Sequence, residues 1–253
     1  MEIKMIVTDL DGTLLRRDKI ISDYTISVLN ECKKKGIKIV FATARPERMT
    51  KMFREKIQPD YVISNNGATI NCGDIVIKNF AIPKSIKDEI IALLAISSEI
   101  DCMTVEVGDC LFTDYSGTDW EKEWNTVFAD FSNAVYADVP KISVDCGNIS
   151  FLENLMQKFP ELHLYNNYGE TWSQIMCREA TKMNGILYIV KQLGFTTKNI
   201  AAFGDDMNDL EMLRNCGIGV AVENATAEVK SAADYICAAN DNDGVAKWLN
   251  ENL

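Results

Sequence analysis

The segment Met5-Ile6-Val7-Thr8-Asp9-Leu10-Asp11-Gly12-Thr13 decides both the fold and the chemistry of this chain. Its first half is a short apolar run, which is typical of a strand buried in a sheet. Two carboxylates, Asp9 and Asp11, follow where the run ends and the chain turns at Gly12. Two carboxylates at the end of a strand do not stabilise an apolar core, because burying their charge costs free energy. A magnesium-assisted attack on phosphorus, in contrast, uses both. We therefore expect this turn to lie in the active site.

The composition limits the domain number and the kinds of binding partner that we expect for the chain. The chain has 253 residues, 47% of them hydrophobic, which is enough for one large domain or two small ones. Its 26 Lys and Arg against 37 Asp and Glu give a formal charge of −11, and such a surface repels nucleic acid and anionic membranes. No run is long and apolar enough to span a bilayer, and the N-terminus does not resemble a signal peptide. We expect a cytoplasmic protein, a monomer or small homo-oligomer, without nucleic-acid or membrane partners.

Cysteine and histidine usage excludes other kinds of chemistry. The eight cysteines are scattered and form no C-x-x-C pair, so we expect free thiols in a reducing compartment. His163 is the only histidine. A single histidine therefore argues against a zinc site built on several histidines and against Ser-His-Asp catalysis.

The two ends of the chain share one pattern, in which buried strands alternate with helices. Strands are predicted at 3–8, 37–42, 60–64, 199–203, 217–222 and 234–237. Helices are predicted after the capping or opening residues Ser22, Pro46, Thr181 and Asp206, with a last helix anchored by Trp248. Continuous apolar strands that alternate with helices indicate an α/β fold with a parallel sheet covered on both faces.

The pattern changes in the middle of the chain. Short strands are predicted at 102–107, 110–114 and 141–146, with helices at 86–97 and 149–159. This is typical of an α+β domain inserted into an α/β domain. We therefore expect residues 1–81 and 179–253 to form the catalytic core and residues 82–178 to form the inserted domain.

Two further segments are suited to binding an anion. Thr43-Ala44-Arg45 follows a predicted strand and precedes a helix, where a hydroxyl and backbone N–H groups can hold a phosphate; taken alone, Thr43 is equally well explained as a helix cap. Lys182 begins its helix, and a cation there opposes the helix dipole. An anionic ligand would explain that position, although a solvated surface lysine is the alternative.

A fourth segment, Gly204-Asp205-Asp206-Met207-Asn208-Asp209, holds three carboxylates and an amide directly after a predicted strand. These carboxylates repel one another unless a cation intervenes, and hard oxygen ligands suit Mg²⁺. Asp206 or Asn208 could serve only as a helix cap, but Asp205 together with Asp209 is harder to explain structurally. All four segments fall at the edge of a parallel sheet where ligands bind.

In this order, the four segments resemble the haloacid dehalogenase-like hydrolase superfamily. The insertion between the second and third segments, together with Asn66-Gly67-Ala68, resembles its Cof-type phosphatase branch. The resemblance implies a Rossmann-like parallel-sheet core, an α+β cap domain at 82–178 that sets substrate specificity, and Mg²⁺ as cofactor. Two departures are visible: Ala44 stands where glycine is usual, and Met183 follows Lys182 where glycine is common. Neither removes a reacting group.

The resemblance also implies a role for each candidate residue. Asp9 would attack phosphorus and form an aspartyl-phosphate, and Asp11 would act as general acid and base, which requires a carboxyl able to hold a proton near neutral pH. Contacts to phosphate or substrate are expected from Thr43, Ala44, Arg45, Lys182 and Asn208. Magnesium contacts are expected from Asp9, the Asp11 carbonyl, Asp205 and Asp209, the last of which could instead orient water or Lys182.

We expect the chain to hydrolyse small phosphorylated metabolites. Between Lys84 and Glu179 there are 17 acidic and six basic residues, which suits a neutral, hydroxyl-rich leaving group such as a sugar better than one with a second phosphate. Glu170 and Trp172 are candidate contacts to it. Two alternatives remain: a phosphomutase with the same chemistry, and a regulatory protein that binds Mg²⁺ and phosphate without turnover.

Overall fold

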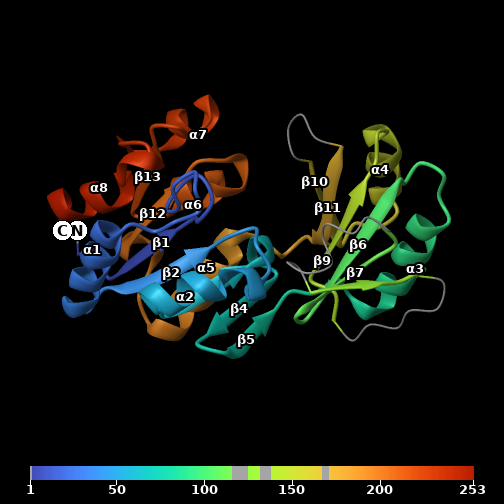
Figure 1. The fold of residues 1–253 in the computed structure, drawn as a ribbon, viewed down its shortest axis with the longest axis horizontal. Helices are drawn as coiled ribbons and strands as arrows, with labels where there is room; N and C mark the ends of the chain where they lie inside the picture. The colour runs from blue at the N-terminus through green and yellow to red at the C-terminus, as the bar shows by residue number, and fades with distance from the viewer. Residues whose placement is uncertain (1, 116–124, 132–137, 167–170) are drawn as a thin grey trace. The chain divides into compact units, whose positions relative to one another are not determined.

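The computed structural model describes residues 2–115, 125–131, 138–166 and 171–253, and the chain forms two compact units (Figure 1). The first unit comprises Met1–Lys78 and Thr181–Leu253, so both ends of the chain contribute to it. The second unit comprises Asn79–Ala180. The candidate contact Glu170 lies outside the described residues.

The first unit is built on a mixed sheet. Its strands, as far as the residues are described, have the order β14-β13-β12-β1-β2-β3-β4-β5. Their bounds are β1 Met5–Thr8, β2 Lys38–Ala42, β3 Tyr61–Ser64, β4 Thr69–Cys72, β5 Ile75–Asn79, β12 Ile200–Gly204, β13 Ile218–Val222 and β14 Tyr235–Cys237. The six strands from β14 to β3 are parallel, which confirms the predicted α/β class. The β4 strand runs antiparallel to β3 and, like β5, was not predicted.

The helices of this unit form two groups. Their bounds are α1 Asp23–Lys34, α2 Lys51–Ile57, α5 Lys182–Leu193, α6 Leu210–Asn215, α7 Ala227–Ala232 and α8 Gly244–Asn252. The α1 helix contacts α2 and α8, whereas α6 contacts α5 and α7. The chain moves outward from β1 through β2 to β3 in one direction and from β12 through β13 to β14 in the other. Because crossovers between parallel strands are right-handed, the two groups cover opposite faces of the sheet.

The local signals in the sequence explain where these helices begin and end. The Ser22 and Thr181 hydroxyls accept the N–H groups of Thr25 and Asn184, so both predicted caps are present. Gly194 ends α5 in the left-handed conformation. After Pro46 and after Asp206 the chain first forms a short 3₁₀ turn, at Glu47–Thr50 and Met207–Asp209, and only then an α-helix.

The second unit has a sheet and a core of its own. In the described part of this unit the strand order is β10-β11-β9-β6-β7-β8. The bounds are β6 Cys102–Val107, β7 Cys110–Thr113, β8 Thr126–Phe128, β9 Lys141–Asp145, β10 Leu162–Asn166 and β11 Trp172–Cys177, with helices α3 Lys84–Ala95 and α4 Ile149–Met156. Ile90, Leu94, Val105, Ile142 and Leu152 are among its buried core residues. The β6 and β7 strands form a hairpin that turns at Gly108, because Val107 pairs with Cys110.

All eight cysteines are free, and six of them are buried. No helix in the described part of the chain has the length and apolar character needed to cross a bilayer.

Candidate active site

The candidate site lies where the strand order of the core sheet reverses. The β1 and β12 strands are parallel neighbours, and from them the chain continues in opposite directions across the sheet. Asp9 directly follows β1, and Asp205 directly follows β12. Such a switch point leaves a crevice at the carboxyl ends of the strands, which is where open α/β sheets bind ligands.

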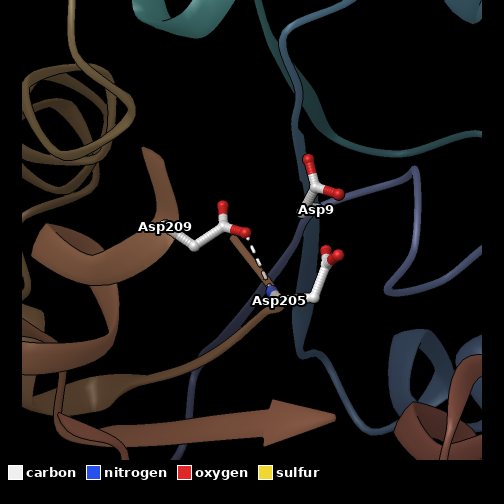
Figure 2. Close-up of side chains that lie close together, drawn as sticks. All are labelled: Asp9, Asp205 and Asp209. Carbon is white, nitrogen blue, oxygen red and sulfur yellow. Dashed lines mark hydrogen bonds between the residues drawn. The ribbon is translucent and has the colours of Figure 1, made fainter. Parts of the chain in front are cut away.

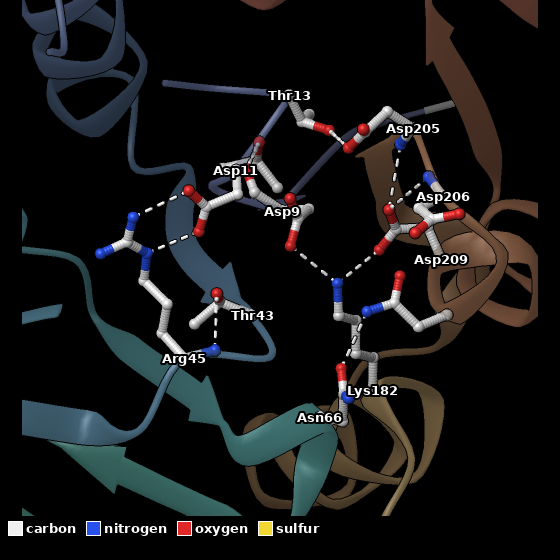
Figure 3. A network of polar contacts seen from close by, with 12 residues as sticks. Asp9, Asp11, Thr13, Thr43, Arg45, Asn66, Lys182, Asp205, Asp206 and Asp209 are labelled. Carbon is white, nitrogen blue, oxygen red and sulfur yellow. Dashed lines mark hydrogen bonds and ion pairs between the residues drawn. The ribbon is translucent and has the colours of Figure 1, made fainter. Parts of the chain in front are cut away.

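Lys182 connects two of the carboxylates. Its Nζ lies 2.7 Å from Asp9 Oδ1 and 2.6 Å from Asp209 Oδ1, and Figure 3 shows the ammonium between them. Lys182 is only 2% exposed and Asp209 is fully buried. The alternative of a solvated surface lysine is therefore wrong, because the side chain of Lys182 points into the site from the first turn of α5.

Asp205 completes a cluster of three carboxylates. Oxygen atoms of Asp9, Asp205 and Asp209 lie within 4.8 Å of one another (Figure 2). Thr13 donates its hydroxyl to Asp205 Oδ1 at 2.6 Å. Gly12 lies against the same carboxylate, since a Cβ at this position would come within 2.3 Å of Asp205 Oδ2, and its φ of +82° also favours glycine.

The cluster carries uncompensated negative charge. Three ionised carboxylates and one ammonium leave a net charge of −2. Burial raises the pKa of Asp9 well above its ordinary value; Lys182 opposes this rise, while Asp209 and Asp205 add to it. Burial also raises the pKa of Asp205, to about 6, although the Thr13 hydroxyl acts in the other direction. A divalent cation would neutralise this charge, and carboxylate oxygens are the ligands that Mg²⁺ prefers.

Lys182 itself stays charged. Burial acts to lower its pKa. The two carboxylates that accept hydrogen bonds from the ammonium, Asp209 and Asp9, outweigh burial and raise the pKa above its ordinary value. An ammonium fixed in this way leaves one edge of the Asp9 carboxylate for other partners.

Asp209 differs from the other two carboxylates, because protein donors occupy both of its oxygens. Oδ1 accepts the Lys182 ammonium, and Oδ2 accepts the N–H groups of Asp205 and Asp206 at 3.0 and 3.2 Å. Asp209 therefore holds Lys182 and the Asp205 loop in place, which leaves Asp9 and Asp205 as the carboxylates better able to contact a metal.

Asp11 lies beside this cluster but is not one of its three carboxylates. Arg45 binds it through two hydrogen bonds, from Nε at 2.5 Å and from Nη2 at 2.8 Å, and Lys19 Nζ lies 2.7 Å from its Oδ1. Burial alone would raise the pKa of Asp11, but the hydrogen bonds from Arg45 and Lys19 outweigh it and lower the pKa. The acid and base role expected of Asp11 needs a carboxyl that holds a proton near neutral pH, and in this arrangement the contacts with Arg45 and Lys19 favour the ionised form.

The Thr43 loop is joined to the rest of the site by a turn that the sequence did not identify as functional. Thr43 Oγ1 accepts the Arg45 N–H, and the Thr43 carbonyl accepts the Asn66 N–H. Asn208 donates its side-chain amide to Asn66 Oδ1 at 2.8 Å. Asn66 thus contacts both the Thr43 loop and the 3₁₀ turn that carries Asn208.

The turn Asn65–Gly67 has an uncommon backbone. Asn65 and Asn66 both have positive φ angles, of 48° and 53°, and that of Gly67 is 107°. A Cβ on Gly67 would come within 2.1 Å of the Thr181 carbonyl, so the turn packs directly against the residue that caps the Lys182 helix. The Asn-Asn-Gly sequence signals left-handed backbone, but nothing local in it indicates these distant partners.

A family model for haloacid dehalogenase-like hydrolases matches residues 6–249 of the chain. The chain belongs to the haloacid dehalogenase-like hydrolase family. The predicted resemblance to this family and to its Cof-type branch is thereby confirmed.

Several phosphatases of this family are similar to the chain over nearly its full length. The 5-amino-6-(5-phospho-D-ribitylamino)uracil phosphatase YcsE of Bacillus subtilis (strain 168) is 28% identical over 252 residues, covering 98% of this chain and 95% of that protein. The structure of the subclass IIB sugar phosphatase BT4131 matches with a TM-score of 0.83 at 25% identity, covering 98% of each chain. A haloacid dehalogenase-like hydrolase from Bacteroides thetaiotaomicron shares the fold at a TM-score of 0.87 and 23% identity, covering 100% of each chain. This haloacid dehalogenase-like chain is therefore a phosphatase.

The two residues that depart from the family pattern, Met183 and Ala44, differ in burial in this phosphatase. Met183 is buried, at 5% exposure, on the inward side of α5. Ala44 is half-buried between Thr43 and Arg45. Neither substitution replaces a side chain of the cluster formed by Asp9, Lys182, Asp205 and Asp209.

Proposed function

We propose that this haloacid dehalogenase-like phosphatase is Mg²⁺-dependent and hydrolyses small phosphate monoesters of hydroxyl-rich compounds, with sugar phosphates favoured. The observation that carries the proposal is the Lys182 ammonium between Asp9 and Asp209, with Asp205 beside them at the switch point of the sheet. Phosphoryl transfer depends mainly on positioning and charge stabilisation, and this cluster supplies both.

Asp9 is the proposed nucleophile. Lys182 holds its Oδ1, and the other oxygen attacks phosphorus as the bond to the leaving oxygen breaks, giving an aspartyl-phosphate that water then hydrolyses. The Lys182 ammonium remains next to the transferred group, where it neutralises charge on the phosphoryl oxygens. Thr43 and the backbone around Ala44 are proposed to bind the remaining phosphoryl oxygens, and Asn208 to contact substrate.

Asp11 is the proposed general acid and base. In the present arrangement its carboxylate is bound by Arg45 and Lys19, so Asp11 acts only after these contacts have been exchanged. Arg45 is half-buried and its guanidinium lies 5.2 Å from the centre of the Phe53 ring. The incoming phosphate is the proposed alternative partner of this guanidinium, since a phosphate also accepts two hydrogen bonds from arginine.

Asp9 and Asp205 would hold Mg²⁺, together with the Asp11 carbonyl, while Asp209 positions Lys182 and the Asp205 backbone. When bound, the cation would neutralise the phosphoryl oxygens and orient the substrate. The fit rests on the donors themselves, because these crowded carboxylates carry more negative charge than the Lys182 ammonium offsets.

Composition and relatives support a hydroxyl-rich leaving group. One relative is named as a sugar phosphatase and another as a phosphatase of a ribitylamino-uracil phosphate, and both names describe a phosphate on a polyhydroxylated carbon chain. We further propose that residues 82–178 serve as a cap whose acidic surface disfavours a second phosphate, with Trp172 among its substrate contacts. The buried free thiols support a cytoplasmic location.

The test is phosphate release from a panel that includes hexose and pentose phosphates, ribitol phosphate and aryl phosphate, with and without Mg²⁺. Turnover that requires both Mg²⁺ and Asp9 is expected, and Asp9→Asn should abolish it while thermal unfolding stays near that of wild type. Wild-type turnover by Asp9→Asn would exclude Asp9 as nucleophile. Turnover that depends on a sugar bisphosphate activator would instead indicate a phosphomutase.

A further inference from the structure

The loop between β13 and α7, residues 223–226, contacts two backbone segments of the candidate metal site, the Gly12 turn and Asp205. Asn224 donates its side-chain amide to the Gly12 carbonyl at 2.7 Å. Two residues later, the Thr226 N–H donates to the Asp205 carbonyl at 3.0 Å. One short loop therefore contacts the backbone of the turn that carries Asp9 and Asp11 and the backbone of Asp205.

The orientation of the Asn224 amide is fixed by a second contact. Its Oδ1 accepts the Asn240 N–H at 3.0 Å, so its nitrogen must face Gly12. Asn240 is 5% exposed and also donates to the Leu15 carbonyl at 2.8 Å. The Asn224 amide is therefore held by Asn240, which also binds the segment after Gly12 through the Leu15 carbonyl.

Gly12 transmits this contact to the carboxylate. Its Cα hydrogens lie over Asp205, because a Cβ there would come within 2.3 Å of Oδ2. The next residue, Thr13, donates its hydroxyl to Asp205 Oδ1. A shift of the Gly12 carbonyl would therefore move both groups that fix the Asp205 side chain.

We propose that Asn224 is a positioning residue for the metal site, which holds the Gly12 turn at the distance from Asp205 that a divalent cation requires. The inference rests on the proposed Mg²⁺ dependence of the enzyme. Asn224 does not touch the metal or the substrate in this assignment, and it acts through Gly12 and Thr13.

The test is calorimetric titration of the full-length protein with Mg²⁺ in the absence of substrate, comparing wild type with Asn224→Ala. Because Asn224 is exposed, the variant should fold. Loss of one hydrogen bond should raise the Kd for Mg²⁺ roughly two- to tenfold, and the Mg²⁺ concentration giving half-maximal turnover should rise in parallel.

Asn199→Ala is the matched control. Asn199 also donates its amide to a distant backbone carbonyl, that of Glu2, at 3.0 Å, but it lies at the opposite end of β12 from Asp205. Its Kd for Mg²⁺ should equal that of wild type. An unchanged Kd in Asn224→Ala, or an equal rise in both variants, would overturn the inference while leaving the proposed function intact. Absence of Mg²⁺ binding by wild type would overturn both.

Discussion

At the scale of single residues, Lys182 is the residue on which the site depends most. It is a buried cation whose two partners are also nearly or fully buried, with side-chain exposures of 8% for Asp9 and 1% for Asp209. Removing the ammonium leaves both carboxylates unpaired in a medium that solvates their charge poorly. Stability and the proposed catalysis therefore depend on the same ammonium.

Lys182→Met should abolish turnover and lower the free energy of unfolding by about 3–5 kcal/mol in metal-free buffer. Mg²⁺ should recover part of that loss, because the cation supplies positive charge to the same carboxylates. Urea unfolding with and without Mg²⁺, beside phosphate release, measures both effects.

Lys87→Met is the control for this change. Lys87 is fully buried in the second unit, but its partner Asp88 is more than half exposed and can be solvated once alone. This variant should keep wild-type turnover, and Mg²⁺ should stabilise it no more than wild type. A Lys182→Met protein as stable as wild type would contradict the charge argument.

The raised pKa of Asp205 predicts how Mg²⁺ affinity depends on pH. The folded value of about 6 lies above the ordinary value of 3.8, so the metal-free folded state holds a proton that the unfolded state releases. Stability from this group is present below pH 3.8 and is lost as the pH rises through 6. Cation binding requires the ionised form, so Mg²⁺ affinity should fall about tenfold per pH unit below 6 for one displaced proton.

Calorimetric titrations between pH 5 and 7 check this dependence. Asp206→Asn should retain it, since Asp206 is exposed and its carboxylate caps the Met207 N–H. An affinity for Mg²⁺ that is constant across this range would mean that no carboxyl of the cluster takes up a proton there.

At the scale of elements, the turn Asn65–Gly67 between β3 and β4 joins three parts of the site. It meets the Thr43 loop through backbone hydrogen bonds, the Asn208 turn through a side-chain pair, and the start of α5 through close packing of Gly67. The position of this turn therefore affects the spacing of the Thr43 loop, the Asn208 turn and the start of α5.

Gly67→Ala should therefore disturb the catalytic elements more than its size suggests. The added Cβ would overlap the Thr181 carbonyl, and the free energy of unfolding should fall by about 1–3 kcal/mol more than in the control. The rate constant kcat should fall as well, because Lys182 follows Thr181. The measurements are chemical unfolding and steady-state kinetics.

Gly73→Ala is the matched control. Gly73 also has a positive φ, of 58°, but a Cβ there meets nothing within 4 Å. Its effect should be limited to backbone strain, with kcat unchanged. Equal effects of the two substitutions would show that the contact with Thr181 is unimportant.

Elements with strong local signals could be predicted from the sequence. Ser22 and Thr181 mark helix starts by hydrogen bonds to residues three positions on, and buried runs such as 37–42 mark strands. The hairpin of β4 and β5 lacked such a signal, since Ile75 and Val76 are exposed at the sheet edge. Likewise, Asp9, Lys182 and Asp205 were named from their motifs, whereas the pairing of Arg45 with Asp11 depends on folded distances between segments 34 residues apart.

At the scale of the whole molecule, each of the two units has a hydrophobic core of its own. The core of Asn79–Ala180 is formed by residues of that unit alone, and the carboxylate cluster belongs entirely to the other unit. A ligand of the cluster should therefore stabilise one unit by mass action.

Differential scanning calorimetry should resolve two unfolding transitions, and saturating Mg²⁺ should raise the temperature of one of them. At a hundred times the Kd the gain is about 2.7 kcal/mol. Asp205→Asn should remove the shift and leave the other transition unchanged. An equal rise of both transitions would indicate that the units unfold together.

The strand order of the core also has a consequence during synthesis on the ribosome. Thr8 in β1 pairs with Phe203 in β12, so one side of β1 has no partner until residue 203 has been made. At about 5–20 residues per second, that interval is on the order of ten seconds or longer. The residues that separate the two strands include Asn79–Ala180, which can complete its own fold meanwhile. During this interval the nascent N-terminal strands expose an unpaired apolar edge that can pair with other chains. We expect chaperones to bind the chain mainly at this stage.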